Sequence, residues 1–109
     1  MRHGISPVLP AVEYIKQHYT EEFDVAMLRG MCYLSEDQFF SLFKKAVGMS
    51  PVQYKNFLRV ERAKELLLEG RHLEREIAAM LGFKNLNYFC IVFKARTGVT
   101  PLSYQRAHT

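Results

Sequence analysis

The sequence of 109 residues has few cysteines and no long hydrophobic run. Cys32 and Cys90 lie in separate apolar segments without a histidine or cysteine at metal-ligand spacing, which argues against a disulfide framework and a zinc site. The longest apolar run is six residues, Tyr88 to Phe93. A membrane-spanning helix needs ~20 such residues, and the N-terminus has no apolar stretch typical of a signal peptide. We therefore expect a cytoplasmic protein that does not enter a membrane.

Sequence patterns that mark catalytic and cofactor sites are also missing. There is no glycine-rich phosphate loop, no GxSxG turn and no HExxH helix. The histidines are scattered singly, at His3, His18, His72 and His108. These absences predict a protein that is not an enzyme, with no catalytic residue, no metal site and no cofactor.

The composition is that of a folded domain. Hydrophobic residues make up 49% of the chain and charged residues 24%, which is sufficient apolar content for a core. A length of 109 residues fits one domain and leaves no room for a second. We expect a single domain over residues 1–109, either the C-terminal part of a longer protein or a protein that acts alone.

The net charge of +4 is spread unevenly along the chain. Residues 1–37 carry three basic and six acidic side chains, a balance of −3, whereas residues 38–64 carry six basic and one acidic, a balance of +5. Residues 77–109 carry four basic side chains and no acidic one. Two basic blocks therefore flank an acidic block at 65–76, which indicates an anionic partner.

Capping and stop signals predict an all-α chain of seven helices. Apolar residues recur at helical spacing from Leu9, and Asp24, Ser35, Asn85 and Thr100 are each placed to begin a helix. Further helices are expected over 51–69, which begins with Pro51 as its first residue, and from Leu73 to Gly82. Glycines at 48, 70, 82 and 98 mark helix ends.

The two halves of the chain repeat one motif. With an offset of 50 residues the halves match as Phe39 with Phe89, Phe43 with Phe93, Lys44 with Lys94, Gly48 with Gly98, Pro51 with Pro101 and Tyr54 with Tyr104. Upstream the offset is 49, so that Leu28 matches Ile77 and Met31 matches Met80. The second copy therefore has one extra residue in the turn between its two main helices.

Each copy is predicted to be a helix-turn-helix. A helix with its side chains is ~10–12 Å wide and fits the major groove of DNA, which is about 12 Å wide. A continuous helix over 51–69 would be roughly 28 Å long, close to the ~34 Å between successive major grooves on one face of a duplex. Two copies joined by such a helix could read two adjacent grooves.

These residues resemble the DNA-binding domain of the AraC/XylS family of bacterial transcription regulators. The resemblance covers about residues 9–107. Its strongest parts are Phe43-Lys44-Lys45, Gly48 to Tyr54, Arg59, Arg62-Ala63, Leu67, Ile77-Ala78, Gly82-Phe83, Tyr88-Phe89, Phe93-Lys94, Gly98, Pro101 and Tyr104. It implies two helix-turn-helix halves, at about 7–50 and 71–109, joined by the helix 51–69, with recognition helices over 36–46 and 86–96.

The chain departs from the family pattern on both recognition helices. The pattern commonly places an arginine two residues before the inward phenylalanine, where this chain has Ser41 and Ile91. In the first copy, Arg29 replaces a small alanine and Tyr33 occupies the position of the turn glycine. The side chains predicted to face the bases are Asp37, Phe40, Ser41, Leu86, Asn87, Cys90 and Ile91. Apolar contacts suit the thymine methyl and asparagine pairs with adenine, so we expect a preference for A·T base pairs.

Phosphate contacts are expected from the basic residues around the same helices. The predicted set is Lys44, Lys45, Lys84, Asn85, Lys94 and Arg96. The phenylalanines of the repeat are interpreted as core residues, and Phe40 as either partly exposed or packed. Arg59 and Arg62 are interpreted as structural, through ion pairs or backbone hydrogen bonds.

The sequence thus predicts a sequence-specific, double-stranded DNA-binding domain of a transcription regulator. The alternative is a protein-interaction module that keeps the fold with weakened base readout, since Ser41, Ile91 and an exposed Phe40 are compatible with it. RNA polymerase is a further candidate partner. A small-molecule effector is expected to act only through a domain absent from this chain.

Overall fold

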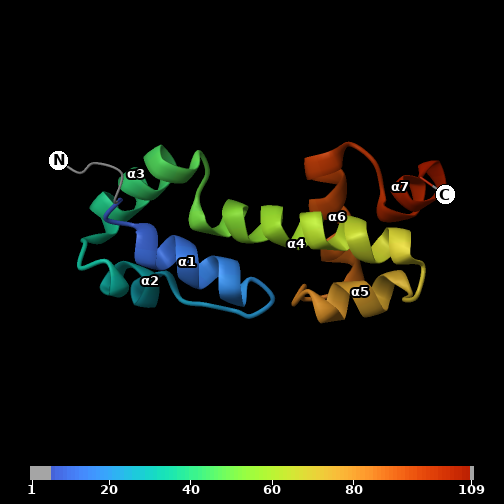
Figure 1. The fold of residues 1–109 in the computed structure, drawn as a ribbon, viewed down its shortest axis with the longest axis horizontal. Helices are drawn as coiled ribbons and strands as arrows, with labels where there is room; N and C mark the ends of the chain where they lie inside the picture. The colour runs from blue at the N-terminus through green and yellow to red at the C-terminus, as the bar shows by residue number, and fades with distance from the viewer. Residues whose placement is uncertain (1–5, 109) are drawn as a thin grey trace. The chain divides into compact units, whose positions relative to one another are not determined.

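A computed structural model describes residues 6–108, and these residues form an all-helical fold of seven helices (Figure 1). Residues 1–5 and 109, which include His3 and both ends of the predicted domain, lie outside the described part. The helices are α1 (Leu9–His18), α2 (Val25–Met31), α3 (Glu36–Val47), α4 (Pro51–Glu69), α5 (Glu74–Met80), α6 (Leu86–Thr97) and α7 (Pro101–Ala107). The predicted all-α class is confirmed.

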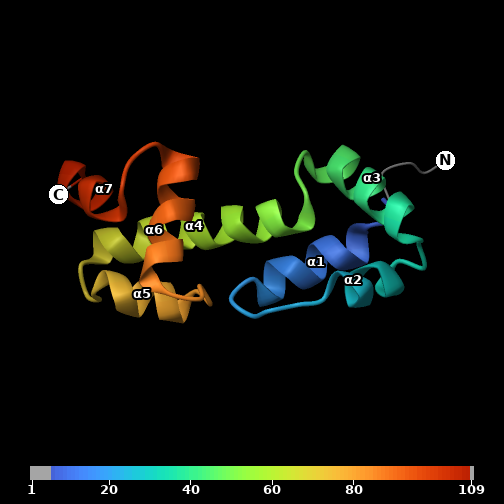
Figure 2. The same ribbon diagram turned by 180° about the vertical axis from the view of Figure 1, so that it is seen from behind.

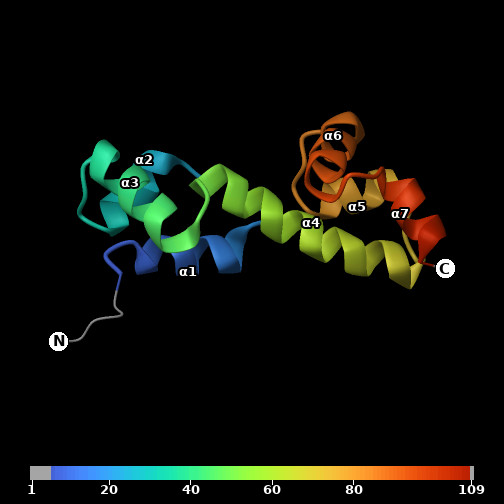
Figure 3. The same cartoon turned by 90° about the horizontal axis from the view of Figure 1, so that it is seen from above.

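The described residues fall into two compact units that divide within α4. The first unit holds α1, α2, α3 and the start of α4 up to Lys55. The second holds Tyr19–Glu21, the rest of α4 and helices α5, α6 and α7. Within the first unit α2 packs against both α1 and α3, and within the second α6 packs against both α5 and α7 (Figures 2 and 3).

Besides Ser50 before α4, whose Oγ accepts the Gln53 N–H at 3.1 Å, side-chain caps begin four of the helices at the residues that the sequence predicts. At each, a side-chain oxygen accepts a hydrogen bond from a backbone N–H two or three residues further along. The N-caps are Asp24 of α2, Ser35 of α3, Asn85 of α6 and Thr100 of α7. Ser35 forms a full capping box, because its own N–H also donates to the Gln38 side chain at 3.2 Å.

Helix α5 is shorter than the prediction of a helix from Leu73 to Gly82. Leu73 is its N-cap and Leu81 its C-cap, so neither belongs to the helix. The Leu73 N–H donates to Oε1 of Glu76 at 2.8 Å, so a carboxylate three residues into the helix does the capping. A leucine at the cap has no polar side chain to mark the helix start, so its apolar spacing predicts a helical residue.

Glycines end both of the recognition helices in the left-handed conformation. Gly48 follows α3 with φ of 88°, and Gly98 follows α6 with φ of 87°. Their N–H groups donate to the carbonyls of Lys44 and Lys94 at 2.7 and 2.8 Å. The repeat in the sequence is therefore also a repeat of backbone geometry.

The core of the first unit is built on one face of α3. Phe39 and Phe43 are fully buried, with ring centroids 5.6 Å apart. Tyr54, at the start of α4, meets Phe43 edge-on with a centroid separation of 6.1 Å. Phe40 lies beside Phe39 and keeps 37% of its surface exposed, so it is the partly exposed member of the series.

The second unit repeats this arrangement on α6. Phe89 and Phe93 are fully buried with ring centroids 5.9 Å apart, and Tyr104 of α7 meets Phe93 at 5.6 Å. Other buried members of this core are Val60, Ala63, Leu66, Leu67, Ile77, Ala78, Leu81, Phe83 and Val92. The interpretation of the repeated phenylalanines as core residues is confirmed in both units.

Arg59 is a buried charged residue of the second unit, with 2% of its surface exposed. Its guanidinium donates to the backbone carbonyls of Tyr19, Gly82 and Glu21 at 2.6, 3.0 and 3.3 Å. These bonds tie the segment before α2 to the turn after α5, which confirms a backbone-bonding role for Arg59. Arg62 instead pairs with Glu65 at 2.8 Å near the surface.

Within 6–108 no helix is both long enough and apolar enough to span a bilayer. The same residues contain no group of three or more His, Cys, Asp or Glu side chains that could hold a metal ion.

Candidate nucleic-acid interface

The turn of the first helix-turn-helix is a Schellman motif at the end of α2. The Tyr33 N–H donates to the Gly30 carbonyl, and the Leu34 N–H reaches back to the Arg29 carbonyl, both at 3.2 Å. In this motif the residue after the C-cap takes the left-handed conformation, and here that residue is Tyr33 with φ of 57°. The bonds stop α2 and bring the chain directly to the Ser35 cap of α3.

The second turn has the same hydrogen bonds. The N–H groups of Gly82 and Phe83 donate to the carbonyls of Ala79 and Ala78 at 3.1 and 3.0 Å, and Gly82 has φ of 86°. One more residue, Lys84, then precedes the Asn85 cap of α6. The predicted extra residue of the second copy therefore lies in its turn.

The predicted base-facing residues of α3 share one exposed face with a lysine. Asp37, Phe40, Ser41 and Lys44 are all exposed. They lie three, four and seven residues after Asp37, which places all four within an arc of about 100° around the helix. Lys45 is also exposed and lies about 80° around the helix from Asp37.

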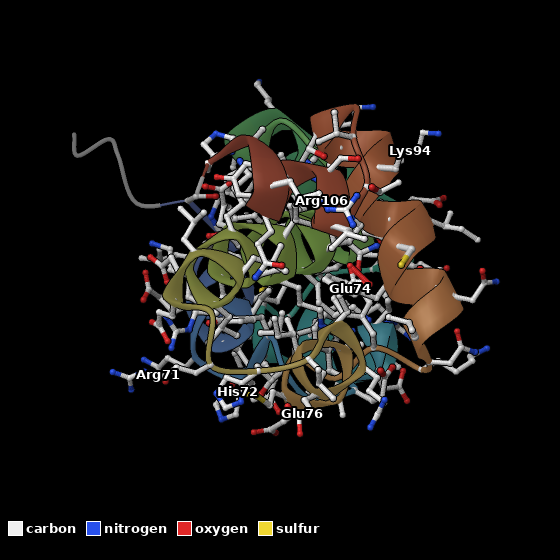
Figure 4. All side chains as sticks on the ribbon, turned by 90° about the vertical axis from the view of Figure 1, so that its right-hand side faces the viewer. Arg71, His72, Glu74, Glu76, Lys94 and Arg106 are labelled. Carbon is white, nitrogen blue, oxygen red and sulfur yellow. The ribbon has the colours of Figure 1, made fainter. Side chains whose placement is uncertain are left out.

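The matching face of α6 holds Asn87, Cys90, Ile91 and Lys94. Ile91 has 57% of its surface exposed, Asn87 and Lys94 are exposed, and Cys90 is partly buried. Figure 4 shows Lys94 projecting outward from α6. Each helix therefore presents a small set of side chains that a groove could receive, with a lysine about two turns from the N-terminal end.

Two of the predicted contacts lie away from this face of α6. Leu86 lines a pocket of about 340 Å³ together with Leu67 of α4 and Leu102 of α7. Arg96 lies nine residues from Asn87, about 180° around the helix, and its guanidinium carbon is 5.5 Å from the centroid of the Phe57 ring. Both remain predicted contacts, but the structure does not group them with the residues around Asn87.

The start of α6 presents polar groups. Asn85 Oδ1 accepts the Tyr88 N–H at 2.8 Å, which leaves the side-chain NH₂ of Asn85 directed to other partners. Lys84 and Asn85 are both exposed. They lie beside the N-terminal turn, where backbone N–H groups favour anions.

The two recognition helices differ in charge at their N-terminal ends. The first turn of α3 carries Glu36 and Asp37, which stabilise the helix but repel phosphate. The first turn of α6 has no acidic residue, and Lys84 precedes it. The second motif is therefore the more favourable of the two for a polyanion.

The thiol of Cys90 lies at the edge of the α6 face. Burial raises the pKa of Cys90, and the nearby carboxylate of Glu74 raises it further. Figure 4 shows Glu74 directed toward the interior of the second unit, and its Oε2 atom is buried with no hydrogen-bond partner among the described residues. The thiol is thus held in its neutral form near pH 7, as a small and weakly polar group.

Tyr33 is an exposed residue of this region that the predicted contact set leaves out. Its side chain is 94% exposed at the turn just before α3. The signal was present in the repeat, because at the offset of 49 residues Tyr33 matches Gly82. A tyrosine in place of a turn glycine indicates an unusual backbone, but it does not by itself predict a contact.

Comparison with known proteins identifies similar sequences along most of the chain. A family model described as a helix-turn-helix domain matches residues 30–107. The chain is 34% identical over 92 residues to the probable transcriptional regulator LumQ of Photobacterium leiognathi. This match covers 84% of this chain and 37% of that protein. This chain spans from about a third to just under half of the length of the curated relatives that it matches.

Solved structures have the same fold. The DNA-binding domain of the transcriptional factor AdpA, solved with a target DNA, superimposes with a TM-score of 0.85 at 28% identity and covers 95% of this chain and 94% of that one. A probable AraC family transcriptional regulator from Rhodopseudomonas palustris superimposes with a TM-score of 0.82, covering 95% of this chain and 98% of that one. Its identity of 23% shows the fold alone.

Proposed function

The chain belongs to the AraC family of helix-turn-helix transcription regulators, and we propose that it binds double-stranded DNA in a sequence-specific manner to control transcription. The observation that carries this proposal is the repeated exposed face, Asp37 to Lys44 on α3 and Asn87 to Lys94 on α6. A rigid core of buried phenylalanines holds each face, and the solved complex of the AdpA domain with DNA supports the assignment.

We propose that each recognition helix enters a major groove with its N-terminal half. Asn87 can pair with the N6 and N7 atoms of adenine, and Ile91 can contact the thymine methyl group. On α3, Asp37 can accept from the N4 amino group of cytosine, while Phe40 and Ser41 offer apolar and weak polar contacts. With no arginine in these positions, guanine readout is weak and A·T pairs are favoured.

Phosphate contacts supply most of the affinity in this proposal. Lys44, Lys45, Lys84, Asn85 and Lys94 border the two exposed faces, and Arg96 lies farther round α6. Each neutralised phosphate releases counterions, so binding should weaken as salt increases. The length of α4 supports the further proposal that the two motifs enter adjacent grooves.

A protein-interaction module is the alternative, and the relatives do not favour it because they are transcription regulators. RNA polymerase stays a proposed second partner of the DNA-bound domain. A small-molecule signal is proposed to act only through a domain that this chain does not contain.

The direct test is selection of preferred sites from a pool of randomised duplexes. The proposal predicts enrichment of a motif in which A·T pairs dominate at the positions read by α6. Asn87→Ala should cost ~1–3 kcal/mol at one base position and little elsewhere. Enrichment of no motif, or of one dominated by guanine contacts on both helices, would contradict this readout.

A further inference from the structure

Tyr33 combines an unusual backbone with an unusual degree of exposure. It is the non-glycine residue with positive φ among residues 6–108, and its exposure of 94% exceeds that of every other exposed large hydrophobic side chain described. Within the same residues its side chain has no hydrogen bond and no ring contact. A side chain that touches so little of its own protein contributes little to holding the turn.

The backbone at this position favours glycine. The Schellman motif requires a left-handed residue after the C-cap, a conformation in which Cβ crowds the backbone of any residue but glycine. The second copy satisfies this requirement with Gly82. Tyr33 therefore strains the same turn, and a glycine would form it more readily. Strain of this kind, without a compensating contact inside the protein, points to a contact outside it.

The location of the turn indicates what that contact is. In a helix-turn-helix the first helix crosses the DNA backbone and the N-terminal end of the second reaches the bases, so the turn between them lies at the edge of the groove. Tyr33 is two residues before the Ser35 cap of α3. The corresponding turn of the second copy carries the additional Lys84, a cation suited to phosphate.

We infer that Tyr33 is a DNA-backbone contact of the first motif, donating its phenolic hydroxyl to a phosphate oxygen at the edge of the groove that α3 enters. The inference rests on the proposed function. A neutral donor suits this position because Glu36 and Asp37 lie close by in the chain, and a hydroxyl can bind phosphate without forming an ion pair with either of them.

The test compares Tyr33→Gly and Tyr33→Phe with the wild-type chain, using a duplex selected for tight binding and a random duplex of the same length. Both variants should weaken binding about three- to tenfold, the effect of one hydrogen bond, and should do so equally on both duplexes. The urea midpoint of Tyr33→Gly should be unchanged or higher, because glycine relieves the turn. If Tyr33→Gly binds duplex more weakly but is no less stable to urea, the loss of affinity reflects a lost DNA contact and not a folding defect.

Tyr14→Phe is the matched control, because it removes a hydroxyl from a tyrosine of α1 whose ring stacks on His18 at 4.1 Å. This variant should bind both duplexes like the wild type. If the wild type binds with the expected salt dependence and Tyr33→Gly binds equally well, the inference is wrong and the proposed function stands. If the wild type binds no duplex, both fail together.

Discussion

Arg59 Nη1 donates a hydrogen bond to the backbone carbonyl of Gly82 at 3.0 Å, which joins the long helix α4 to the turn of the second helix-turn-helix. The same guanidinium binds the carbonyls of Tyr19 and Glu21 and lies 5.2 Å from the centroid of the Phe83 ring. The position of the turn, and with it the start of α6, is therefore fixed by a buried cation rather than by apolar packing alone.

Replacing Arg59 should destabilise the second unit strongly. Arg59→Met keeps an unbranched apolar side chain but leaves three backbone carbonyls without their donors, at about 1–3 kcal/mol for each buried group. We expect a loss of about 3–5 kcal/mol in the free energy of unfolding, measured by urea denaturation. Arg62→Met, at the surface pair with Glu65, should cost below about 1 kcal/mol. Equal losses would show that Arg59 is not the anchor.

Gly82 and Gly98 offer a matched test of close packing, because their φ angles are 86° and 87°. At Gly98 an added Cβ meets nothing within 4 Å, whereas at Gly82 it would overlap the carbonyl oxygen of Thr20. Gly98→Ala should cost about 1 kcal/mol from backbone strain alone. Gly82→Ala should cost at least about 3 kcal/mol, because the backbone itself must move. Similar losses in thermal or urea unfolding would contradict the packing described for this turn.

Substitutions at Lys94 and Arg96 should have different effects, one on duplex affinity and the other on the stability of the fold. Lys94 projects from the proposed DNA face, so Lys94→Ala should weaken binding to all duplexes and reduce the salt slope by about 0.9. Arg96 lies over the Phe57 ring, so Arg96→Ala should mainly lower stability, by about 0.5–1 kcal/mol. Fluorescence titrations at several salt concentrations and urea unfolding give both values. A larger loss of slope for Arg96→Ala would reverse this assignment.

Asp37 and Asn87 occupy matching positions of the two recognition helices, 50 residues apart. Asp37→Asn removes a negative charge next to the proposed groove, so affinity for duplexes in general should rise while preference at one base position is lost. Asn87→Asp should lower affinity for every duplex. Titration against the selected and random duplexes checks both. Affinities that do not respond to either change would place these residues outside the interface.

Cys90 should react slowly with alkylating reagents although it is partly accessible. Burial and the Glu74 carboxylate raise the thiol pKa, so the reactive thiolate is scarce at pH 8. Iodoacetamide should label Cys90 more slowly than a cysteine in a short unfolded peptide, and bound duplex should slow it further. Because the pKa is raised in the folded state, this group should lower stability only as pH rises above its unfolded value of about 8.5. Fast labelling that duplex does not affect would contradict both the burial and the position of Cys90.

The parts of the fold that depend on neighbouring residues in the chain could be predicted from the sequence. Ser35 and Asn85 begin helices because their side chains bind N–H groups three residues away, and Gly48 and Gly98 end them because glycine adopts positive φ freely. The buried phenylalanines of the repeat could also be predicted, because their helical spacing places them on one face of each helix. The start of α5 differs from the prediction, because the Glu76 side chain, and not a polar N-cap residue, accepts the Leu73 N–H.

Contacts between distant segments could not be predicted in the same way. No pattern near Arg59 indicates that its partners are carbonyls some 40 residues earlier and 23 residues later. The position of Arg96 over Phe57 likewise depends on how α6 meets α4 within the second unit. The two basic blocks of the sequence indicate an anionic partner. Charge alone does not distinguish an arginine that faces the DNA groove from one that packs on an aromatic ring.

The most direct test of DNA binding is the dependence of duplex affinity on salt. If about four to six phosphates are neutralised, log K should fall against log salt concentration with a slope of about −4 to −5. The measurement uses the chain as it stands and a random duplex, so it does not depend on knowing the operator. A slope in this range supports an interface of lysines against phosphates, and a slope near zero would contradict the account.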